Sequence, residues 1–301
     1  MTGTGPRVLR TVFMGVPTAF SAAPLQRMLE LPAVEVVAVA LPGQPPPHPA
    51  WELPVRAAIP DPVTALVEKH GVTSLALADL HAASIARLEA LSPDLIVVAC
   101  YPKLFPPALL SLPQRGCLNL HPSLLPRYRG PAPLFWQFRM GERRGGVTLH
   151  YMTDTPDGGP ILAQAPMALP DGITRTEATQ RLAVHAADLL EQALPQVRSA
   201  TQRPIPQDEA RSTHYPWPAA KDFEVPWYWP VRRAFIFIRG TAASGQTHTV
   251  ITGGGRRLPV VDAVDYNEGE VLEKDYQAAG RRLRIRFSAG VLDAVAADDG
   301  C

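Results

Sequence analysis

Asn119 and His121 stand two residues apart in an otherwise apolar run that ends at Pro122. Residues two apart on a β-strand project from the same face, which places an amide and a titratable imidazole side by side. Pro122 biases the backbone of His121 toward extended conformations. Such a pair can stabilise negative charge on oxygen or move a proton. For this tripeptide alone, a strand end whose polar residues satisfy loop backbone is the commoner meaning.

A carboxylate follows in the turn Asp157-Gly158-Gly159, directly after another expected strand. The two glycines permit backbone angles that a Cβ would forbid, so the turn can press Asp157 toward His121. Taken by itself, an Asp-Gly turn that only joins two strands is the more frequent meaning.

The elements that must position these residues alternate between strand and helix. Short, apolar, β-branched runs predict the strands Val8–Met14, Val34–Leu41, Ser74–Ala78, Leu95–Cys100, Gly116–Leu120 and Val147–Met152. Helical spacing predicts the helices Ala22–Glu30, Pro62–His70, Ala82–Leu91 and Thr174–Arg198. This order is typical of an α/β fold with a Rossmann-like, mostly parallel sheet, in which ligands bind at the carboxyl ends of the strands.

The composition and the periodicity of the sequence change after this domain. Residues 1–198 are predicted to form the catalytic domain, and the proline-rich residues 199–230 read as a linker. Residues 231–301 are predicted to form a smaller β-barrel of the OB type. Its expected strands are Ala234–Arg239, Thr247–Ile251, Leu258–Val264, Val271–Tyr276 and Leu283–Phe287.

Composition narrows the class of protein. The 301 residues carry 29 Lys and Arg against 28 Asp and Glu, which gives no net field for DNA or an anionic membrane. Three cysteines without paired spacing argue against a disulfide framework and a zinc ribbon. No signal peptide and no membrane-spanning run is recognised, so a cytoplasmic protein is predicted. The segment Pro42–Pro62 holds eight prolines and is expected to form an exposed loop.

Two segments together carry a specific resemblance. The run from Asn119 through His121-Pro-Ser-Leu-Leu-Pro-Arg-Tyr-Arg-Gly130, followed by Gly146-Val-Thr and by Asp157-Gly-Gly-Pro-Ile161, resembles the formyltransferase family in order and spacing. The resemblance covers roughly residues 8–195. It implies that Asn119, His121 and Asp157 form the catalytic set, and that 10-formyltetrahydrofolate donates a formyl group to an amine without a metal.

Each implied role also makes physical sense. The Asn119 amide and a protonated His121 would stabilise the negative charge that develops on the formyl oxygen. Asp157 would favour the imidazolium and relay the proton that leaves the amine.

The resemblance also implies where the folate co-substrate binds. The family's site maps onto the loop after Leu95–Cys100, where backbone groups hold the pterin, and onto the segment after His121. The implied folate-binding residues are Tyr101, Leu104, Ser123, Leu124, Leu125 and Pro126. Leu104 and Leu125 would supply apolar walls, although ordinary core leucines are an equally good interpretation. Cys100 reads as a small buried hydrophobe.

The acceptor amine is less well defined. Domain order and the opening Gly15-Val16-Pro17, where Val16 replaces the usual threonine, resemble the methionyl-tRNA branch of the family. Residues 201–301, however, hold 13 basic and 13 acidic residues, and tRNA docking favours clustered positive charge. A small amine, such as a nucleotide-linked amino sugar or an amino acid, is therefore an alternative acceptor. Hydrolysis of the formyl donor is a further alternative.

Several other residues have open interpretations. Arg127 and Arg129 either bind a glutamyl tail or an acceptor phosphate, or are solvated loop arginines. Arg281, Arg282, Arg284 and Arg286 form a cluster that is more consistent with a solvated barrel face than with an RNA contact. His150 is expected to pack in a core or strand. The aromatic residues Trp217, Phe223, Trp227, Tyr228 and Trp229 either stack on a ligand or, more in keeping with their place, pin the linker to the catalytic domain.

Overall fold

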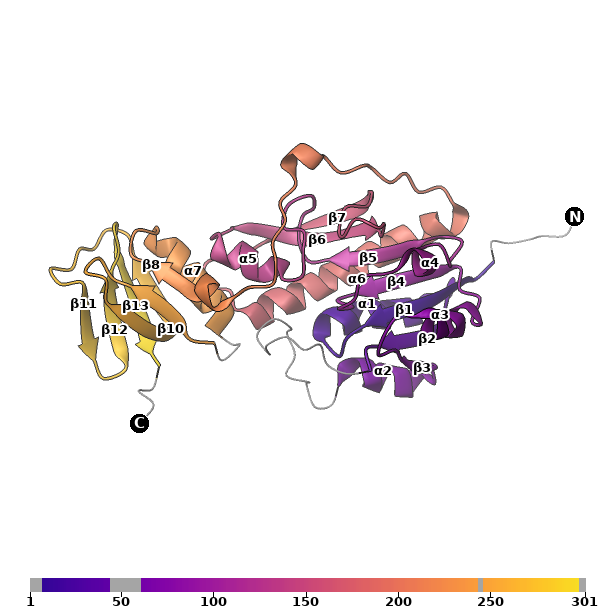
Figure 1. Ribbon diagram of the computed structural model, residues 1–301, viewed down its shortest axis with the longest axis horizontal. Coiled ribbons are helices and arrows are strands. Elements are labelled where there is room, and N and C mark those ends of the chain that lie inside the picture. Colours follow the sequence, from indigo (N-terminus) through magenta and orange to yellow (C-terminus); the bar gives the residue numbers. More distant parts are fainter. Residues whose placement is uncertain (1–6, 44–60, 243–245, 298–301) are drawn as a thin grey trace, which may run out of the picture.

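The computed structural model describes residues 7–43, 61–242 and 246–297. Two sheets organise these residues, one in each half of the chain (Figure 1). Most of the expected loop Pro42–Pro62 lies outside the described residues. Among the residues that the structure describes, no helix is long and apolar enough to cross a membrane.

The first sheet has seven strands in the order β3-β2-β1-β4-β5-β6-β7. Neighbouring strands from β3 to β5 pair in parallel, whereas β6 pairs antiparallel with both β5 and β7. The strands are β1 (Leu9–Gly15), β2 (Val34–Leu41), β3 (Ser74–Ala76), β4 (Leu95–Ala99), β5 (Cys117–His121), β6 (Arg144–Tyr151) and β7 (Ile161–Ala168). The mostly parallel α/β sheet predicted from the sequence is confirmed, and β7 is a strand that the sequence analysis missed.

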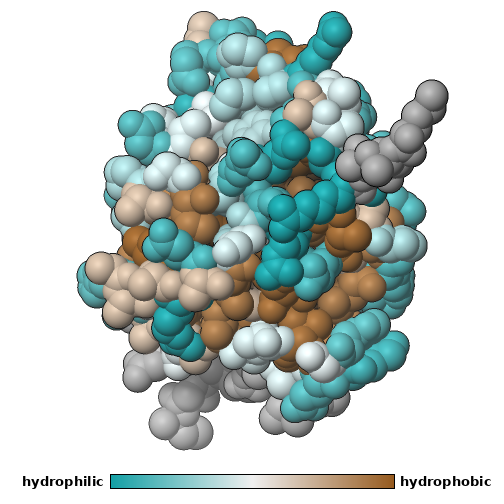
Figure 2. All heavy atoms as spheres, turned by 90° about the vertical axis from the view of Figure 1, so that its right-hand side faces the viewer, coloured by the Kyte–Doolittle hydropathy of each residue, from teal (hydrophilic) through white to brown (hydrophobic). Residues whose placement is uncertain are grey.

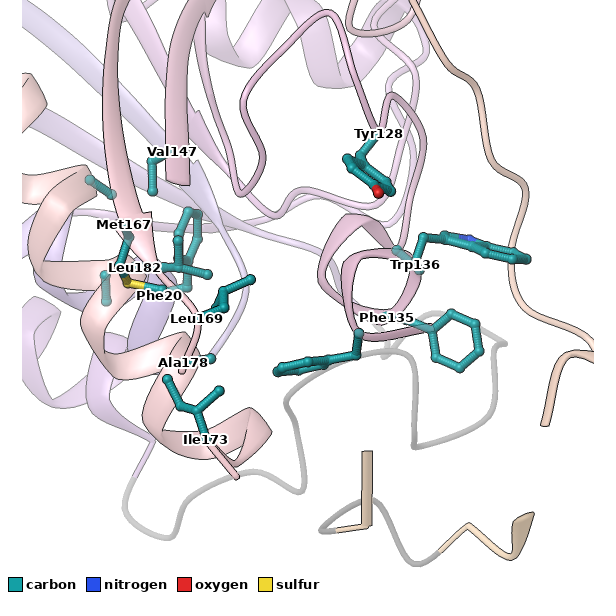
Figure 3. Close-up of a cluster of buried hydrophobic side chains, with 14 of the residues drawn as sticks. Phe20, Tyr128, Phe135, Trp136, Val147, Met167, Leu169, Ile173, Ala178 and Leu182 are labelled. Atoms are coloured by element: carbon teal, nitrogen blue, oxygen red, sulfur yellow. The ribbon is translucent and has the colours of Figure 1, made fainter. Parts of the chain in front are cut away.

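Helices cover this sheet. They are α1 (Ala19–Glu30), α2 (Pro62–His70), α3 (Ala82–Glu89), α4 (Pro107–Leu110), α5 (Pro133–Arg139) and α6 (Arg175–Ser199). The long helix α6 begins at a capping box in which Thr174 and Glu177 satisfy each other's backbone N–H groups. It packs against α1, β6 and β7. Figure 3 shows Ala178 and Leu182 of α6 beside Phe20, Met167 and Leu169.

The second sheet is formed by six strands in the order β11-β12-β13-β10-β9-β8. Its elements are β8 (Glu224–Pro226), α7 (Val231–Thr241), β9 (His248–Ile251), β10 (Arg257–Asn267), β11 (Tyr276–Ala279), β12 (Arg282–Arg286) and β13 (Val291–Ala296). The two outer strands, β11 and β8, do not pair with each other among the described residues. The sheet is therefore open in its hydrogen bonding, and closure into an OB-like barrel stays a prediction.

Two predicted strands of this half are wrong. Ala234–Arg239 lies inside helix α7, whose residues from Ala234 to Ile238 are all buried. A continuous apolar run fits a helix enclosed on several sides as well as it fits a buried strand, and α7 is enclosed by α5, β10 and β13. In Val271–Tyr276 only Tyr276 is in a strand, because pairing of β11 with β12 begins at Tyr276 and Ile285.

The segment 199–230, predicted as a linker, joins the two halves by contact as well as by sequence. It contains the 3-10 turns η1 (Glu209–Arg211) and η2 (Ala220–Phe223) and contributes β8 to the second sheet. One buried cluster runs from the first sheet into α7, with Phe135 of α5 and Phe237 of α7 at 5.4 Å between ring centroids. Figure 1 shows the segment crossing over the first sheet on its way to α7. The predicted boundaries at 198 and 230 remain predictions.

The surface away from this contact mixes polar and apolar side chains. Seen from the right-hand side of Figure 1, apolar side chains gather in patches that polar ones border (Figure 2). The exposed large hydrophobic residues include Val8 and Leu104. Apolar atoms contribute much of the exposed surface of an ordinary globular protein.

Candidate active site

Asn119 and His121 lie on β5, next to the antiparallel strand β6. The register places Asn119 opposite His150, and His121 opposite Thr148. Side chains of directly paired residues emerge on the same face, so Asn119, His121 and His150 share one face of the sheet. The expected juxtaposition of Asn119 and His121 is therefore present, and β6 adds a second histidine to it.

The His121 ring is held from one side. Its Nε2 atom lies 2.8 Å from the main-chain carbonyl oxygen of Tyr128, so Nε2 carries the proton and donates. Its Nδ1 atom lies 3.5 Å from Oδ1 of Asp157. That distance is long for a direct hydrogen bond and leaves Nδ1 as the ring nitrogen available to a reacting atom. His121 is 4% exposed, which keeps bulk water away from most of the ring.

Asp157 reaches His121 through an unusual backbone conformation. Asp157 itself has a left-handed φ of 53°, whereas neither Gly158 nor Gly159 has a positive φ. The glycines were expected to supply that freedom, so this part of the prediction is wrong. Gly159 is needed for close approach instead, because a Cβ there would lie 1.9 Å from the Tyr151 carbonyl oxygen. The second carboxylate oxygen of Asp157 accepts a hydrogen bond of 2.8 Å from the backbone N–H of Gly130.

His150 belongs to this group, although its sequence position indicated only packing. Its Nδ1 lies 2.8 Å from the Tyr151 carbonyl oxygen and therefore donates, which leaves Nε2 to accept from the Asn119 amide at 3.1 Å. Burial lowers the pKa of His150 to about 4, so the ring is neutral near pH 7. The 3.9 Å approach of His150 to Asp157 is then not an ion pair. His150 fixes the orientation of the Asn119 amide.

A cavity of about 580 Å³ opens over these side chains. Asn119, His121 and Asp157 line it together with His150, and its other walls are mostly apolar. Of the predicted folate-binding residues, Tyr101 and Leu104 line the cavity. Tyr101 is 9% exposed and its hydroxyl donates to the Leu77 carbonyl, whereas Leu104 is 76% exposed.

The other four predicted folate-binding residues, Ser123, Leu124, Leu125 and Pro126, are not among the residues described as lining this cavity. Ser123 is fully buried and donates to the Arg127 carbonyl oxygen. The backbone N–H of Leu125 donates to the hydroxyl of Thr148, and that hydroxyl donates to the Ser123 carbonyl. These contacts fix the conformation of the loop after His121, which contains all four residues. We therefore expect them to affect the cavity indirectly, through the shape of this loop.

The two arginines of the same loop have protein partners. Arg129 is 1% exposed and forms hydrogen bonds with Gln207 and Glu209. Arg127 pairs with Glu142 at 2.5 Å. The interpretation of Arg129 as a solvated loop arginine is wrong, because its side chain is buried and bonded to protein groups. Binding of a glutamyl tail or an acceptor phosphate stays a hypothesis.

Three further cavity residues were not singled out as site residues by the sequence: Phe20 of α1, Arg175 at the start of α6, and Trp217 of the linker. They come from elements far apart in the chain, and no local motif connects them with β5. Trp217 had a partial signal in the density of aromatic residues after residue 216. Cys100 also lines the cavity, and burial raises the pKa of its thiol to about 12, which keeps it protonated and unreactive.

Aromatic side chains pack the linker against α5. Of the residues predicted to pin it, Phe223 contacts α5, whereas Trp227 and Tyr228 are 39% and 65% exposed and Trp217 lines the cavity. Tyr215 stacks on Tyr128 and on Trp136 with ring centroids 5.4 Å and 4.8 Å apart. The Trp136 indole N–H donates to the Pro216 carbonyl, and Phe223 packs on Phe135. Figure 3 shows Trp136 and Phe135 projecting from α5 toward the linker.

Comparison with known proteins places this chain in a family. The family described as Formyl transferase matches residues 10–196. A methionyl-tRNA formyltransferase of Synechococcus sp. (strain JA-3-3Ab) is 33% identical over 276 residues, covering 88% of this chain and 84% of that protein. One from Roseiflexus sp. (strain RS-1) is 37% identical over 226 residues, covering 75% of this chain and 68% of that protein.

Solved structures share the fold at lower identity. An N-formyltransferase from Helicobacter canadensis, in complex with folinic acid and dTDP-3-aminofucose, superimposes with a TM-score of 0.69 at 11% identity, covering 95% of this chain and 98% of that one. A glycinamide ribonucleotide transformylase from Symbiobacterium toebii gives a TM-score of 0.55 at 21% identity, covering 69% of this chain and 98% of that one. The extent of the family match and the identity to curated relatives show that this chain belongs to the formyltransferase family, whose enzymes catalyse one-carbon formyl transfer.

Proposed function

We propose that this enzyme transfers the formyl group of 10-formyltetrahydrofolate to a primary amine, with Asn119, His121 and Asp157 as its catalytic residues. The observation that carries the proposal is the convergence of these three side chains in one cavity, with Nδ1 of His121 3.5 Å from Asp157. The volume of the cavity lies in the range of small-molecule sites, and its walls are mostly apolar, as in such sites.

The residues divide the work by their hydrogen-bonding capacity. When bound, the folate co-substrate supplies an electrophilic formyl carbon, to which the amine nitrogen forms a bond as the bond to the folate nitrogen breaks. Asn119 has one amide N–H committed to His150, so its other N–H can donate to the formyl oxygen as negative charge develops there. His121 donates from Nδ1 when it is protonated. Asp157 accepts the proton that the attacking amine loses, directly or through water, and returns it to the leaving nitrogen.

The folate is proposed to enter beside the loop 101–104, where Tyr101 and Leu104 border the cavity. Two proteins of similar fold were solved with folate derivatives, one with folinic acid and one in the presence of 5-N-formyl-THF, which supports a folate co-substrate for this enzyme. No step in this scheme uses a metal. The predicted cytoplasmic location stays a prediction.

The acceptor is proposed to be methionyl-tRNA, because the curated relatives that cover most of this chain carry that name. Charge favours the alternative of a small amine such as a nucleotide-linked amino sugar. Two arginines of the predicted basic cluster are already paired, Arg284 with Glu270 and Asp293, and Arg286 with Asp275. An RNA phosphate would have to compete with these carboxylates.

Turnover of 10-formyltetrahydrofolate against charged initiator methionyl-tRNA, a panel of small amines and no acceptor distinguishes these functions. A tRNA acceptor predicts formyl-methionyl-tRNA whose rate of formation falls steeply with added salt. Formylation of a small amine independent of salt would reject tRNA, and equal formate release without acceptor would identify a hydrolase. Absence of formyl transfer to any amine, with no formate release, would contradict the proposal.

A further inference from the structure

The linker makes backbone contact with the loop that follows His121. The N–H of Arg129 donates to the Thr213 carbonyl at 2.9 Å, and the N–H of Tyr215 donates to the Arg129 carbonyl at 3.0 Å. The Thr213 hydroxyl accepts from the N–H of Tyr128 at 2.8 Å. At Gly130 the two segments are so close that a Cβ would lie 2.1 Å from the Tyr215 carbonyl oxygen. The linker and this loop thus form one unit.

A buried arginine sits at the centre of that unit. The Arg129 guanidinium donates two bonds to the Glu209 carboxylate, at 2.6 and 2.9 Å, and two to Oε1 of Gln207, at 2.8 and 3.1 Å. Paired, charge-assisted bonds of this kind fix geometry as well as adding stability. Arg129 is 1% exposed, whereas the Glu209 side chain is 66% exposed. The linker supplies both acceptors.

Arg129 determines which way the Gln207 amide points. Because Oε1 accepts from the guanidinium, the NH₂ group must face the other way. It donates to the main-chain carbonyl oxygens of Asp157 and Gly159, both at 2.7 Å. A flipped amide would place its oxygen against two carbonyl oxygens and its NH₂ against a cation. Gln207 is therefore locked in the orientation that holds the Asp157 turn.

One of the two hydrogen bonds from Gln207 is made to Asp157, the residue of the turn with the least favourable backbone conformation. Asp157 has the left-handed φ of 53°, which is unfavourable for a residue with a Cβ and persists only where its surroundings hold it. Gln207 holds its carbonyl, and the N–H of Gly130 holds its carboxylate at 2.8 Å. His121 is held from the same loop, through the carbonyl of Tyr128.

We propose that Gln207, oriented by Arg129, is a positioning residue of the formyl transfer reaction: the linker sets the Asp157 carboxylate against Nδ1 of His121. The inference rests on the proposed catalytic role of Asp157. It makes the linker part of the catalytic apparatus, in addition to its role as a connection between two sheets.

The test compares Gln207→Glu and Gln207→Ala with Gln202→Ala. Gln207→Glu keeps the size and the oxygen that faces Arg129 but removes both N–H donors. Gln202 lies in the same linker and donates to the Tyr151 hydroxyl at 3.0 Å, so its loss removes a comparable bond outside the Asp157 turn. We expect kcat to fall about 10- to 100-fold in both Gln207 variants, because small misplacement of a reacting group is costly. KM for the folate and for the amine should stay within about threefold, as for an interaction that serves the transition state.

A purely structural role would instead lower the thermal midpoint and the active fraction together, with kcat per folded molecule unchanged. That outcome, or Gln207→Glu with the kcat of the natural chain, overturns the inference. Should both Gln207 variants fail to fold, Arg129→Lys decides, because a lysine keeps the positive charge near Glu209 but lacks the paired N–H groups that orient the Gln207 amide. Unchanged kcat in Arg129→Lys then overturns the inference, and a selective loss of kcat supports it.

Asp157→Asn separates this inference from the proposed function. If the Asp157→Asn enzyme is active, Asp157 is not a catalytic residue, and the proposed function fails at this point. An inactive Asp157→Asn enzyme beside fully active Gln207 variants would remove the positioning role alone.

Discussion

Two buried histidines, His150 beside the candidate active site and His248 in the C-terminal half, have the same ionisation behaviour in different surroundings. Burial lowers the pKa of each to about 4. His150 accepts from the Asn119 amide and lines the cavity. His248 lies 2.7 Å from the Thr241 hydroxyl and packs against the rings of Phe223 and Phe237.

The hydrogen bonds give the two rings opposite tautomers. At His150 the proton is on Nδ1, because the Tyr151 carbonyl can only accept. At His248 the Thr241 hydroxyl donates to the Phe237 carbonyl, so the hydroxyl accepts and Nε2 of His248 carries the proton. A lowered pKa therefore reports burial in both places. What marks a functional histidine is the group with which the ring shares a hydrogen bond.

The largest effects are expected from substitutions of the three proposed catalytic residues, compared with a substitution beside His248. Asn119→Ala, His121→Ala and Asp157→Ala should each lower kcat by about 10²- to 10³-fold or more, because each removes a group that acts on developing charge or on a proton. Thr241→Val, which removes the partner of His248 and keeps the shape, is the matched control and should leave kcat per folded molecule unchanged. Near-full activity of His121→Ala would refute the mechanism. Steady-state kinetics with circular dichroism as a folding check gives both quantities.

The second prediction compares the two histidines directly. His150→Leu leaves the Asn119 amide without its acceptor, and we expect kcat to fall about tenfold as the amide loses its fixed orientation. His248→Leu should leave kcat unchanged. Each variant should lose about 1–3 kcal/mol in the free energy of unfolding, since each leaves a buried polar group without its hydrogen-bonding partner. Equal changes of kcat in the two variants would show that the tertiary contact of His150 has no catalytic consequence.

The last prediction is a dependence of stability on pH that both histidines share. Each has an ordinary pKa of 6.5 when unfolded and about 4 when folded. Between these values the unfolded chain binds protons that the folded chain does not, so the free energy of unfolding falls as the pH falls. The slope should be about 1.4 kcal/mol per pH unit for each histidine. Urea unfolding at pH 7, 6 and 5 measures it, and His150→Leu and His248→Leu should each remove a similar share. A slope unchanged in both variants would contradict the assigned burial effect.

The success of the sequence analysis differs between the two halves. Strands β2 and β4 to β6 and helices α1, α2 and α6 were located within a few residues. The strands are short apolar runs buried in the sheet, and the helices bury one face against a neighbouring layer. In the C-terminal half, the apolar run from Ala234 to Ile238 is too short to show a period by itself, and the helical pattern appears only when the flanking Arg232, Arg233 and Arg239 are included. Its identity as helix α7 follows from packing against α5 and β10, which a sequence window does not contain.

The site shows the same division. Asn119, His121 and Asp157 were proposed because two short motifs carry them and because strand alternation places Asn119 and His121 on one face, and all three line the same cavity. His150, Gln207 and Arg129 were not recognised as parts of the same site. His150 enters through antiparallel pairing of β6 with β5, and Gln207 reaches Asp157 across 50 residues of chain.

The sequence alone determined the family, the mostly parallel sheet and the three side chains proposed as catalytic, since each of these rests on local patterns of residue type and spacing. Tertiary structure decided how those side chains are oriented: which nitrogen of His121 is free, which way the Asn119 amide points, and that the linker holds the Asp157 turn. The physical reason is that an orientation is fixed by hydrogen bonds between segments distant in sequence, and these partners become neighbours only when the chain has folded.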